Sequence, residues 1–228
     1  MRIIWLFHLS RWIVYIFSRL YFRIEFEGTE NIPKDGPMLL APNHVSFMDP
    51  LWVSLPVTRP MRYMAWDQLV KKPLVGPLMK AYGSFPVNLE RADRVALRKA
   101  GNQLKRGGGL VIFPEGARSR DGKLAKFKSG VIRLALESDV PIVPATVIGG
   151  YRAYSVHHWL PRPYKVRIVY HPPIRLGAAP EQEVSRQYLR EATAQLRAVV
   201  ASALTEEEKA LALAEEGTRP EKIFPAHP

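Results

Sequence analysis

A histidine and a carboxylate stand five positions apart in the segment Ala41-Pro-Asn-His44-Val-Ser-Phe-Met-Asp49-Pro50. A histidine near its free pKa accepts a proton at neutral pH, and a carboxylate on its other ring nitrogen fixes the tautomer. Five positions of a continuous helix rotate by about 140°, so the two side chains can meet only across a turn. Pro50 favours a helix that begins at Asp49. The segment predicts a general base, or, alternatively, a capping Asp49 and a loop histidine without a chemical role.

A second polar cluster follows the apolar run of residues 110–113. Arg118 could bind phosphate through two parallel hydrogen bonds. Glu115 could hold Arg118 in position or accept a hydrogen bond from a hydroxyl group, and Gly116 would let the backbone approach a ligand closely. The basic side chains of this cluster continue through Arg120, Lys123, Lys126 and Lys128. The cluster indicates an anion-binding site, with a solvated basic turn as the alternative.

Apolar runs that alternate with helical patterns must position these side chains. The patterns predict strands at 23–27, 38–41, 62–66, 84–88, 110–113, 140–148 and 165–170. They predict helices at 51–55, 74–82, 91–106, 126–137 and 181–216, the last with a capping box at 205–208. This alternation indicates an α/β domain with a largely parallel sheet, in which ligands bind beyond the carboxyl ends of strands. His44 and Glu115 each follow a strand, so we expect them to converge on one edge.

Residues 3–22 are mostly apolar and nearly long enough to span a bilayer. Their polar residues form one helical stripe of His8, Arg11, Tyr15, Ser18 and Arg19. Aromatic side chains and interior arginines favour an amphipathic helix that lies in the membrane interface, with a transmembrane, re-entrant or core helix as alternatives. The predicted organisation is a membrane-associated helix at 1–22, a catalytic domain at 23–178, a helical extension at 179–217 and a loose tail at 218–228.

The composition of the chain limits which partners and which catalytic nucleophiles are compatible with it. The chain has 228 residues, a net charge of +12 and no cysteine. The charge favours an anionic partner such as a membrane surface, a nucleic acid or a phosphorylated substrate. The missing cysteines exclude a thiolate nucleophile, and no serine stands in a Gly-x-Ser-x-Gly motif. We therefore expect the histidine to activate a substrate hydroxyl directly. A metal site made by His44, Asp49 and Glu115 is the competing interpretation, but the three lack clustered ligand spacing, so we expect no metal.

Three blocks resemble the PlsC-like glycerolipid acyltransferases, the lysophosphatidate (1-acyl-sn-glycerol-3-phosphate) acyltransferase family. Residues 43–49 resemble its Asn-His-(four residues)-Asp block, residues 113–119 its Phe-Pro-Glu-Gly-x-Arg-Ser block, and residues 140–144 its proline block. The resemblance covers about residues 25–175. Residues 83–88 depart from the family pattern, which has an acid and an arginine after the valine where this chain has Asn-Leu; Arg91 stands two positions later.

The resemblance implies an enzyme of the EC 2.3.1 class that moves an acyl chain from a thioester to the free hydroxyl of a lysophospholipid, typically lysophosphatidic acid, to give phosphatidic acid. It implies that His44 is the general base and Asp49 its partner. Glu115, Gly116 and Arg118 would hold the glycerophosphate, with Arg91 as a possible helper, and Pro141 to Pro144 would line the acyl side.

The resemblance also implies the partners. The donor would be acyl-CoA or acyl-carrier protein, with no bound cofactor. The protein would be membrane-associated, on anionic lipid at the cytoplasmic face of the inner or plasma membrane, and would bind no nucleic acid. The alternatives are another lysolipid acceptor, or a non-catalytic basic module that binds anionic lipid or nucleic acid.

Overall fold

A seven-stranded sheet in the order β1-β7-β6-β2-β5-β3-β4 forms the centre of the computed structural model, which describes residues 2–73, 76–77, 79, 83–87, 94–176 and 184–206. The strands are β1 Glu25–Glu27, β2 Met38–Pro42, β3 Met61–Trp66, β4 Ser84–Val87, β5 Gly109–Val111, β6 Ile142–Ile148 and β7 Arg167–Tyr170. Neighbouring strands are parallel except β6 and β7. The predicted α/β class with a largely parallel mixed sheet is confirmed.

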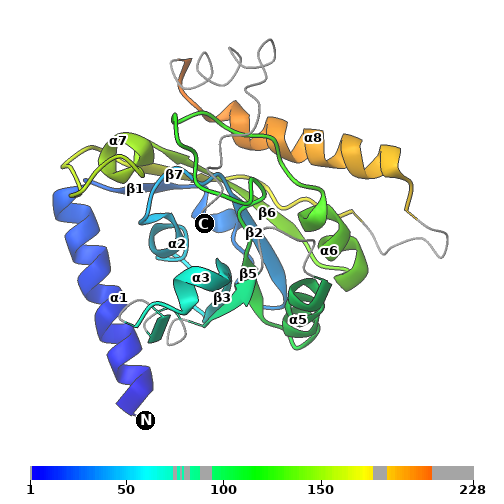
Figure 1. Cartoon of the computed structure of the whole chain (residues 1–228), viewed down its shortest axis with the longest axis horizontal. Helices are drawn as coiled ribbons and strands as arrows, with labels where there is room; N and C mark the ends of the chain where they lie inside the picture. The colour runs from blue at the N-terminus through cyan, green and yellow to red at the C-terminus, as the bar shows by residue number, and fades with distance from the viewer. Residues whose placement is uncertain are drawn as a thin grey trace, which may run out of the picture.

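Helices cover both faces of the sheet (Figure 1). They are α1 Arg2–Tyr21, α2 Asp49–Trp52, α3 Asp67–Val70, α5 Arg94–Lys105, α6 Gly130–Ser138, α7 Gly150–Tyr154 and α8 Arg186–Ser202, with a 3₁₀ turn at Thr29–Asn31. Every residue of β2 and β6 is buried, because strands covered on both faces need apolar side chains on both. Along β2, Leu39 packs with residues of α6 and α8, whereas Leu40 packs with Trp52 on the opposite face.

Several predicted helices have different bounds in the structure. The helix predicted at 51–55 is the single turn α2, and the one predicted at 126–137 begins only at Gly130. Helix α8 begins after Ser185, whose hydroxyl accepts from the backbone N–H of Tyr188 at 3.0 Å, and it ends at Ser202. Parts of three predicted helices lie outside the described residues. They are most of the helix predicted at 74–82, residues 91–93 of the helix predicted at 91–106, and residues 207–216 of the helix predicted at 181–216.

Helix α1 packs against α2 through part of its polar stripe. Arg11 donates to the carbonyl oxygens of Leu55 and Val57 at 2.9 and 2.7 Å, and the buried Ser18 hydroxyl accepts from Trp52 Nε1 at 3.1 Å. These groups therefore face the protein, because the domain offers them hydrogen-bond partners, and apolar side chains of α1 are left exposed. Among the described helices, none is both long and apolar enough to cross a membrane.

Candidate active site

The turn between β2 and α2 brings His44 and Asp49 together. Asp49 is fully buried, and its Oδ2 accepts from His44 Nδ1 at 2.9 Å and from the backbone N–H groups of Val45 and Ser46 at 2.7 Å each. Asp49 is the first residue of α2, and Met48 occupies the capping position without a side-chain bond. The Asp49 carboxylate therefore holds the preceding turn and the imidazole, so the interpretation that it only caps a helix is wrong.

Two neighbours fix the turn on the sheet. The buried Asn43 accepts from the Val147 backbone N–H at 2.7 Å and donates to the Val147 carbonyl at 3.0 Å, so its amide continues the pairing of β2 with β6 beyond the last strand residue. The Phe113 ring stacks on the His44 imidazole, with 3.9 Å between ring centroids. The histidine is thus held at its backbone, its Nδ1 atom and one ring face.

Glu115 holds the backbone of the same turn. Its Oε1 accepts from the His44 N–H at 2.7 Å and its Oε2 from the Ala125 N–H at 2.9 Å, while the Ser119 N–H donates to the His44 carbonyl at 2.8 Å. The convergence of His44 and Glu115 that we expected is therefore present. The carboxylate is committed to backbone donors, which differs from the expectation that it contacts Arg118 or a hydroxyl.

The electrostatics favour a neutral imidazole. Burial lowers the pKa of His44, and Arg118 lowers it further, while the hydrogen bond and charge of Asp49 oppose the shift. Because an ionised carboxylate can only accept hydrogen bonds, the His44 Nδ1 that contacts Asp49 carries the proton, and Nε2 keeps its lone pair. The His44 side chain is 16% exposed, against 0% for Asp49, so the imidazole is the member of the pair that solvent and ligands can reach.

Helix α7 packs against the other side of the carboxylate. A Cβ added to Gly150 would lie 3.0 Å from methyl carbons of Val45 and Val147 and 3.4 Å from Oδ1 of Asp49. Any side chain at this position would crowd Val45 and Val147, which pack beside the buried carboxylate. Glycine here allows the close approach of α7 to the pair.

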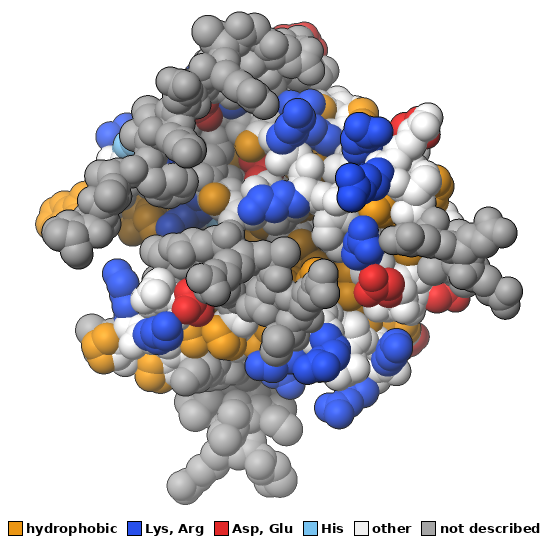
Figure 2. Space-filling view, turned by 45° about the vertical axis from the view of Figure 1, so that its right-hand side comes forward, with side chains coloured by type: hydrophobic (Ala, Val, Ile, Leu, Met, Phe, Trp, Pro, Cys, Tyr) orange, Lys and Arg blue, Asp and Glu red, His pale blue; other side chains and the backbone are white. Residues whose placement is uncertain are grey.

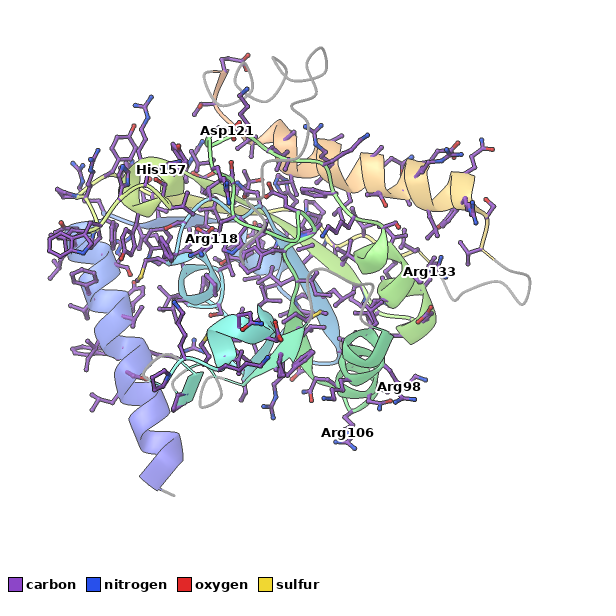
Figure 3. The ribbon with its side chains drawn as sticks, viewed as in Figure 1. Arg98, Arg106, Arg118, Asp121, Arg133 and His157 are labelled. Atoms are coloured by element: carbon purple, nitrogen blue, oxygen red, sulfur yellow. The ribbon has the colours of Figure 1, made fainter. Side chains whose placement is uncertain are left out.

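Arg118 lies at the open side of the turn. Its guanidinium carbon is 3.7 Å from the centroid of the Phe47 ring, and burial lowers its pKa. Among the residues that the structure describes, no carboxylate lies within 4 Å of it. Figure 3 shows Arg118 on the same side as His157 and away from Arg98, Arg106 and Arg133, which lie on and beside α5 and α6. Arg118 is therefore available for an anionic ligand.

The other predicted site residues have different surroundings. Gly116 adopts a φ of +80°, and a Cβ there would come within 2.5 Å of Lys128 Nζ, so its glycine is required by the loop itself. Pro141 precedes β6 at the end of the sheet opposite His44, where its carbonyl accepts from the Leu39 N–H at 2.9 Å. The structure does not bring Pro141 to this site. Arg91 lies outside the described residues.

The alternative of a metal site is not supported by the donor geometry. Asp49 turns Oδ2 to the imidazole, and Glu115 turns both oxygens to backbone N–H groups, so His44, Asp49 and Glu115 do not point to a common centre. Within the described part of the chain, no group of three His, Asp or Glu side chains is arranged to hold a metal ion.

Three contacts were not predicted to contribute to the site. Asn43 directly precedes His44, and Phe113 stands two positions before Glu115. These places in the two motif blocks were the only sign in the sequence that both residues contribute to the site. The third is the carbonyl of Tyr154 at the end of α7, which accepts from the Phe47 N–H at 3.1 Å and the Ser46 hydroxyl at 3.0 Å. No sequence pattern indicates this contact, since 108 positions separate Ser46 from Tyr154.

A neutral histidine held by a buried carboxylate, with an arginine beside it at the edge of an α/β sheet, is an arrangement suited to taking a proton from a hydroxyl group next to a bound anion. The acyltransferase family model matches residues 23–148. The chain belongs to the acyltransferase family, and the family that the sequence predicts is confirmed.

Relatives and a solved structure agree with this family. The chain is 30% identical to the chloroplastic 1-acyl-sn-glycerol-3-phosphate acyltransferase LPAT1 of Arabidopsis thaliana, over 68% of this chain and 44% of the relative. It is 34% identical to the 1-acyl-sn-glycerol-3-phosphate acyltransferase of Borreliella burgdorferi, over 55% of this chain and 51% of the relative. The chain thus spans about half or less of these curated relatives.

A crystal structure gives wider coverage. The 1-acyl-sn-glycerophosphate (LPA) acyltransferase PlsC of Thermotoga maritima matches with a TM-score of 0.61 and 30% identity, over 79% of this chain and 72% of that chain. This match agrees with the predicted single α/β domain, which is confirmed.

Proposed function

We propose that this protein is a 1-acyl-sn-glycerol-3-phosphate O-acyltransferase. It moves a fatty acyl chain from a thioester to the free hydroxyl of lysophosphatidic acid and forms phosphatidic acid. The observation that carries the proposal is the 2.9 Å contact between His44 Nδ1 and the buried Asp49, which leaves the Nε2 lone pair as a base beside Arg118. The names of the relatives support lysophosphatidic acid as the acceptor.

The reaction needs one proton carrier and no enzyme nucleophile. His44 Nε2 takes the proton of the acceptor hydroxyl while that oxygen attacks the thioester carbonyl carbon. The tetrahedral intermediate collapses, the carbon–sulfur bond breaks, and the imidazolium returns its proton to the leaving thiolate. Asp49 stabilises the imidazolium and keeps Nε2 aimed at the acceptor. The lowered pKa of His44 keeps the base form dominant at neutral pH.

Arg118 supplies recognition of the acceptor phosphate, because a guanidinium binds phosphate through parallel hydrogen bonds. Glu115 and Gly116 act through the loop that presents Arg118: Glu115 holds the His44 and Ala125 backbones, and Gly116 supplies the positive φ. Arg91 remains a candidate second phosphate ligand. The contacts of Pro141 give no support for its predicted acyl-side role.

The proposal includes a site of action. The acceptor is a membrane lipid, and α1 exposes apolar side chains, so we place the enzyme at a membrane surface with α1 in the interface. The net charge of +12 favours the anionic cytoplasmic face of the inner or plasma membrane and an acidic donor, acyl-CoA or acyl-carrier protein. The proposal includes no bound cofactor, no catalytic metal and no nucleic acid.

Purified protein incubated with lysophosphatidic acid, acyl-CoA and a chelator tests the reaction. We expect phosphatidic acid from the wild type, and turnover that is roughly 10²–10⁴-fold lower in His44→Ala and roughly 10²-fold lower in Asp49→Asn. Asp67→Asn is the control, because within the described part of the chain the Asp67 carboxylate pairs only with the nearby Lys71. It should match the wild type.

Two outcomes would contradict the proposal. Undiminished turnover in His44→Ala would remove the base from the mechanism. Failure of the wild type with both acyl-CoA and acyl-carrier protein as donors would remove lysophosphatidic acid as the acceptor. Product from a different lysolipid in that case would reassign the acceptor.

A further inference from the structure

The loop after α7 exposes two large apolar side chains. Trp159 is 89% exposed and Leu160 61%, and Trp159 is the most exposed large hydrophobic residue in the described part of the chain. Tryptophan and leucine on a loop tip lose favourable burial free energy in water, and tryptophan favours the interface between water and lipid. Such a pair points to a contact surface, since a soluble domain gains nothing from it.

The loop is fixed beside the C-terminal end of α1. Tyr21 of α1 donates its hydroxyl hydrogen to the Pro161 carbonyl at 2.9 Å, and the Arg162 N–H donates to the Ala153 carbonyl at 2.8 Å. Figure 1 shows the loop and this end of α1 on the same side of the molecule. The exposed apolar side chains of Phe17 and Leu20, at 43% and 78%, belong to the same end of α1 as Tyr21.

Basic and aromatic groups surround a hollow next to the tip. The hollow has a volume of about 330 Å³ and is lined by Tyr151, Arg152, His158, Arg162, Pro163 and Tyr164. The Arg152 guanidinium lies 5.5 Å above the centroid of the Tyr164 ring. Among the residues that the structure describes, those lining the hollow include no Asp or Glu, so their charge complements a phosphate group at the depth where lipid headgroups lie.

We propose that the segment 155–164 is a second membrane-binding element, which inserts Trp159 and Leu160 into an anionic phospholipid leaflet while Arg152 and Arg162 bind headgroup phosphate. The occupant is an anionic bilayer because one surface combines inserted apolar side chains with a basic hollow. Together with α1, the loop gives two points of contact and so fixes the orientation of the domain on the leaflet. This inference rests on the proposed function, in which the acceptor is a lipid.

The segment and the helix before it, α7, are bonded to both halves of the active site. The Arg120 carbonyl accepts from His157 Nε2 at 2.7 Å and from the Tyr151 hydroxyl at 2.8 Å. The Tyr154 carbonyl accepts from the His44 turn through Ser46 and Phe47. Docking of the loop therefore holds the Arg118 segment and the general base at the leaflet from which the acceptor comes.

Sedimentation of the full chain with vesicles of phosphatidylglycerol and phosphatidylcholine tests the loop. The double variant Trp159→Ala, Leu160→Ala should bind roughly tenfold more weakly, because two interfacial side chains are lost. Tyr188→Ala is the matched control: Tyr188 is 39% exposed but lies on α8. Binding equal to the wild type in the double variant, or equal loss in both variants, would overturn the inference.

A second measurement does not depend on the fold of the double variant. Brominated lipid quenches tryptophan fluorescence on contact, and quenching should fall in Trp159→Phe, which keeps an aromatic ring at the tip. Unchanged quenching would contradict insertion of Trp159.

Turnover separates this inference from the proposed function. With a short-chain lysophosphatidic acid dissolved as monomers and no vesicles, the double variant should keep the wild-type kcat. With the acceptor in vesicles, its apparent KM should rise roughly tenfold at unchanged kcat. If neither protein turns over any acceptor while vesicle binding still depends on Trp159, the proposed function fails and the membrane element stands. If turnover is normal and vesicle binding ignores Trp159, only the membrane element fails.

Discussion

Two buried carboxylates lie within one hydrogen bond of His44 and do different work. Asp49 accepts from the imidazole and from two backbone N–H groups, so its charge is available to the reaction. Glu115 accepts only from backbone N–H groups, and burial raises its pKa to about 8 although those hydrogen bonds oppose the shift. At the scale of single residues, the partners of each carboxylate decide whether it serves chemistry or holds the loop.

The raised pKa of Glu115 predicts a pH-dependent stability. A carboxyl whose folded pKa lies above its unfolded pKa stabilises the protein fully below about pH 4.5, and this contribution is lost as pH rises through about 8. The full loss is about 5 kcal/mol. Glu115→Gln cannot titrate, so its free energy of unfolding should vary less between pH 5 and pH 8.

Urea unfolding across this pH range measures the effect. At pH 5, Glu115→Gln should be less stable than the wild type by about 1 kcal/mol, because an amide can satisfy only one of the two N–H donors as an acceptor. The difference should shrink or reverse by pH 8. The exposed Glu30→Gln serves as the control and should follow the wild type. Parallel pH curves for Glu115→Gln and the wild type would refute the titration of Glu115 in this window.

The sequence allowed the pair of His44 and Asp49 to be predicted, because a turn between them is a local feature. The role of Glu115 could not be predicted, because its partner is the backbone of a residue 71 positions away. Sequence patterns report side-chain type and spacing, whereas a backbone N–H without an internal partner becomes visible only in the folded turn. The same limit applies to the Tyr154 carbonyl.

At the scale of elements, α1 is both a membrane candidate and a part of the domain. Phe22, directly after it, is fully buried and packs edge-on against Trp52 of α2, with ring centroids 4.9 Å apart. Ser18 adds a hydrogen bond from Trp52 of α2, and Arg11 adds hydrogen bonds to carbonyl groups of the segment that follows α2. Because α2 begins with Asp49, α1 supports the element that carries the catalytic carboxylate.

Loss of the Arg11 contacts should therefore destabilise the domain. Arg11→Met keeps an unbranched chain but removes two hydrogen bonds from a charged donor, which costs roughly 2 kcal/mol. Thermal unfolding should show a lower Tm, and kcat with a monomeric acceptor should fall if α2 loosens. Arg133→Met is the control, since Arg133 is exposed on α6. An unchanged Tm for Arg11→Met would indicate that α1 does not stabilise the domain.

Most strands could be predicted because buried parallel strands are near-continuous apolar runs, as in β2 and β6. The strand order could not be predicted, since it depends on contacts between runs far apart in the chain. The hydrogen-bond partners of the polar stripe of α1 could not be predicted for the same reason. An arginine satisfied by the carbonyls of Leu55 and Val57 cannot be distinguished in sequence from one that faces headgroups.

At the scale of the whole molecule, charge and apolar surface act together. The 33 Lys and Arg residues exceed the 21 Asp and Glu residues, and Figure 2 shows basic side chains spread across the displayed face with few acidic ones among them. In the proposed membrane binding, the exposed apolar side chains of α1 and the loop act at short range, by insertion. The positive field acts at longer range and draws the protein to an anionic surface before insertion.

The separate roles of long-range charge and short-range apolar insertion predict how salt changes membrane binding. Raising the ionic strength from about 0.1 M to about 0.5 M shortens the screening length from about 10 Å to less than half of that, so long-range attraction weakens. Binding to phosphatidylglycerol vesicles should fall roughly tenfold, because each screened basic group contributes about 1 kcal/mol near an anionic surface. Binding to pure phosphatidylcholine vesicles, which reports apolar insertion alone, should change little and serves as the control. Salt-independent binding to the anionic vesicles would show that the net charge of +12 serves another partner, such as the acidic donor.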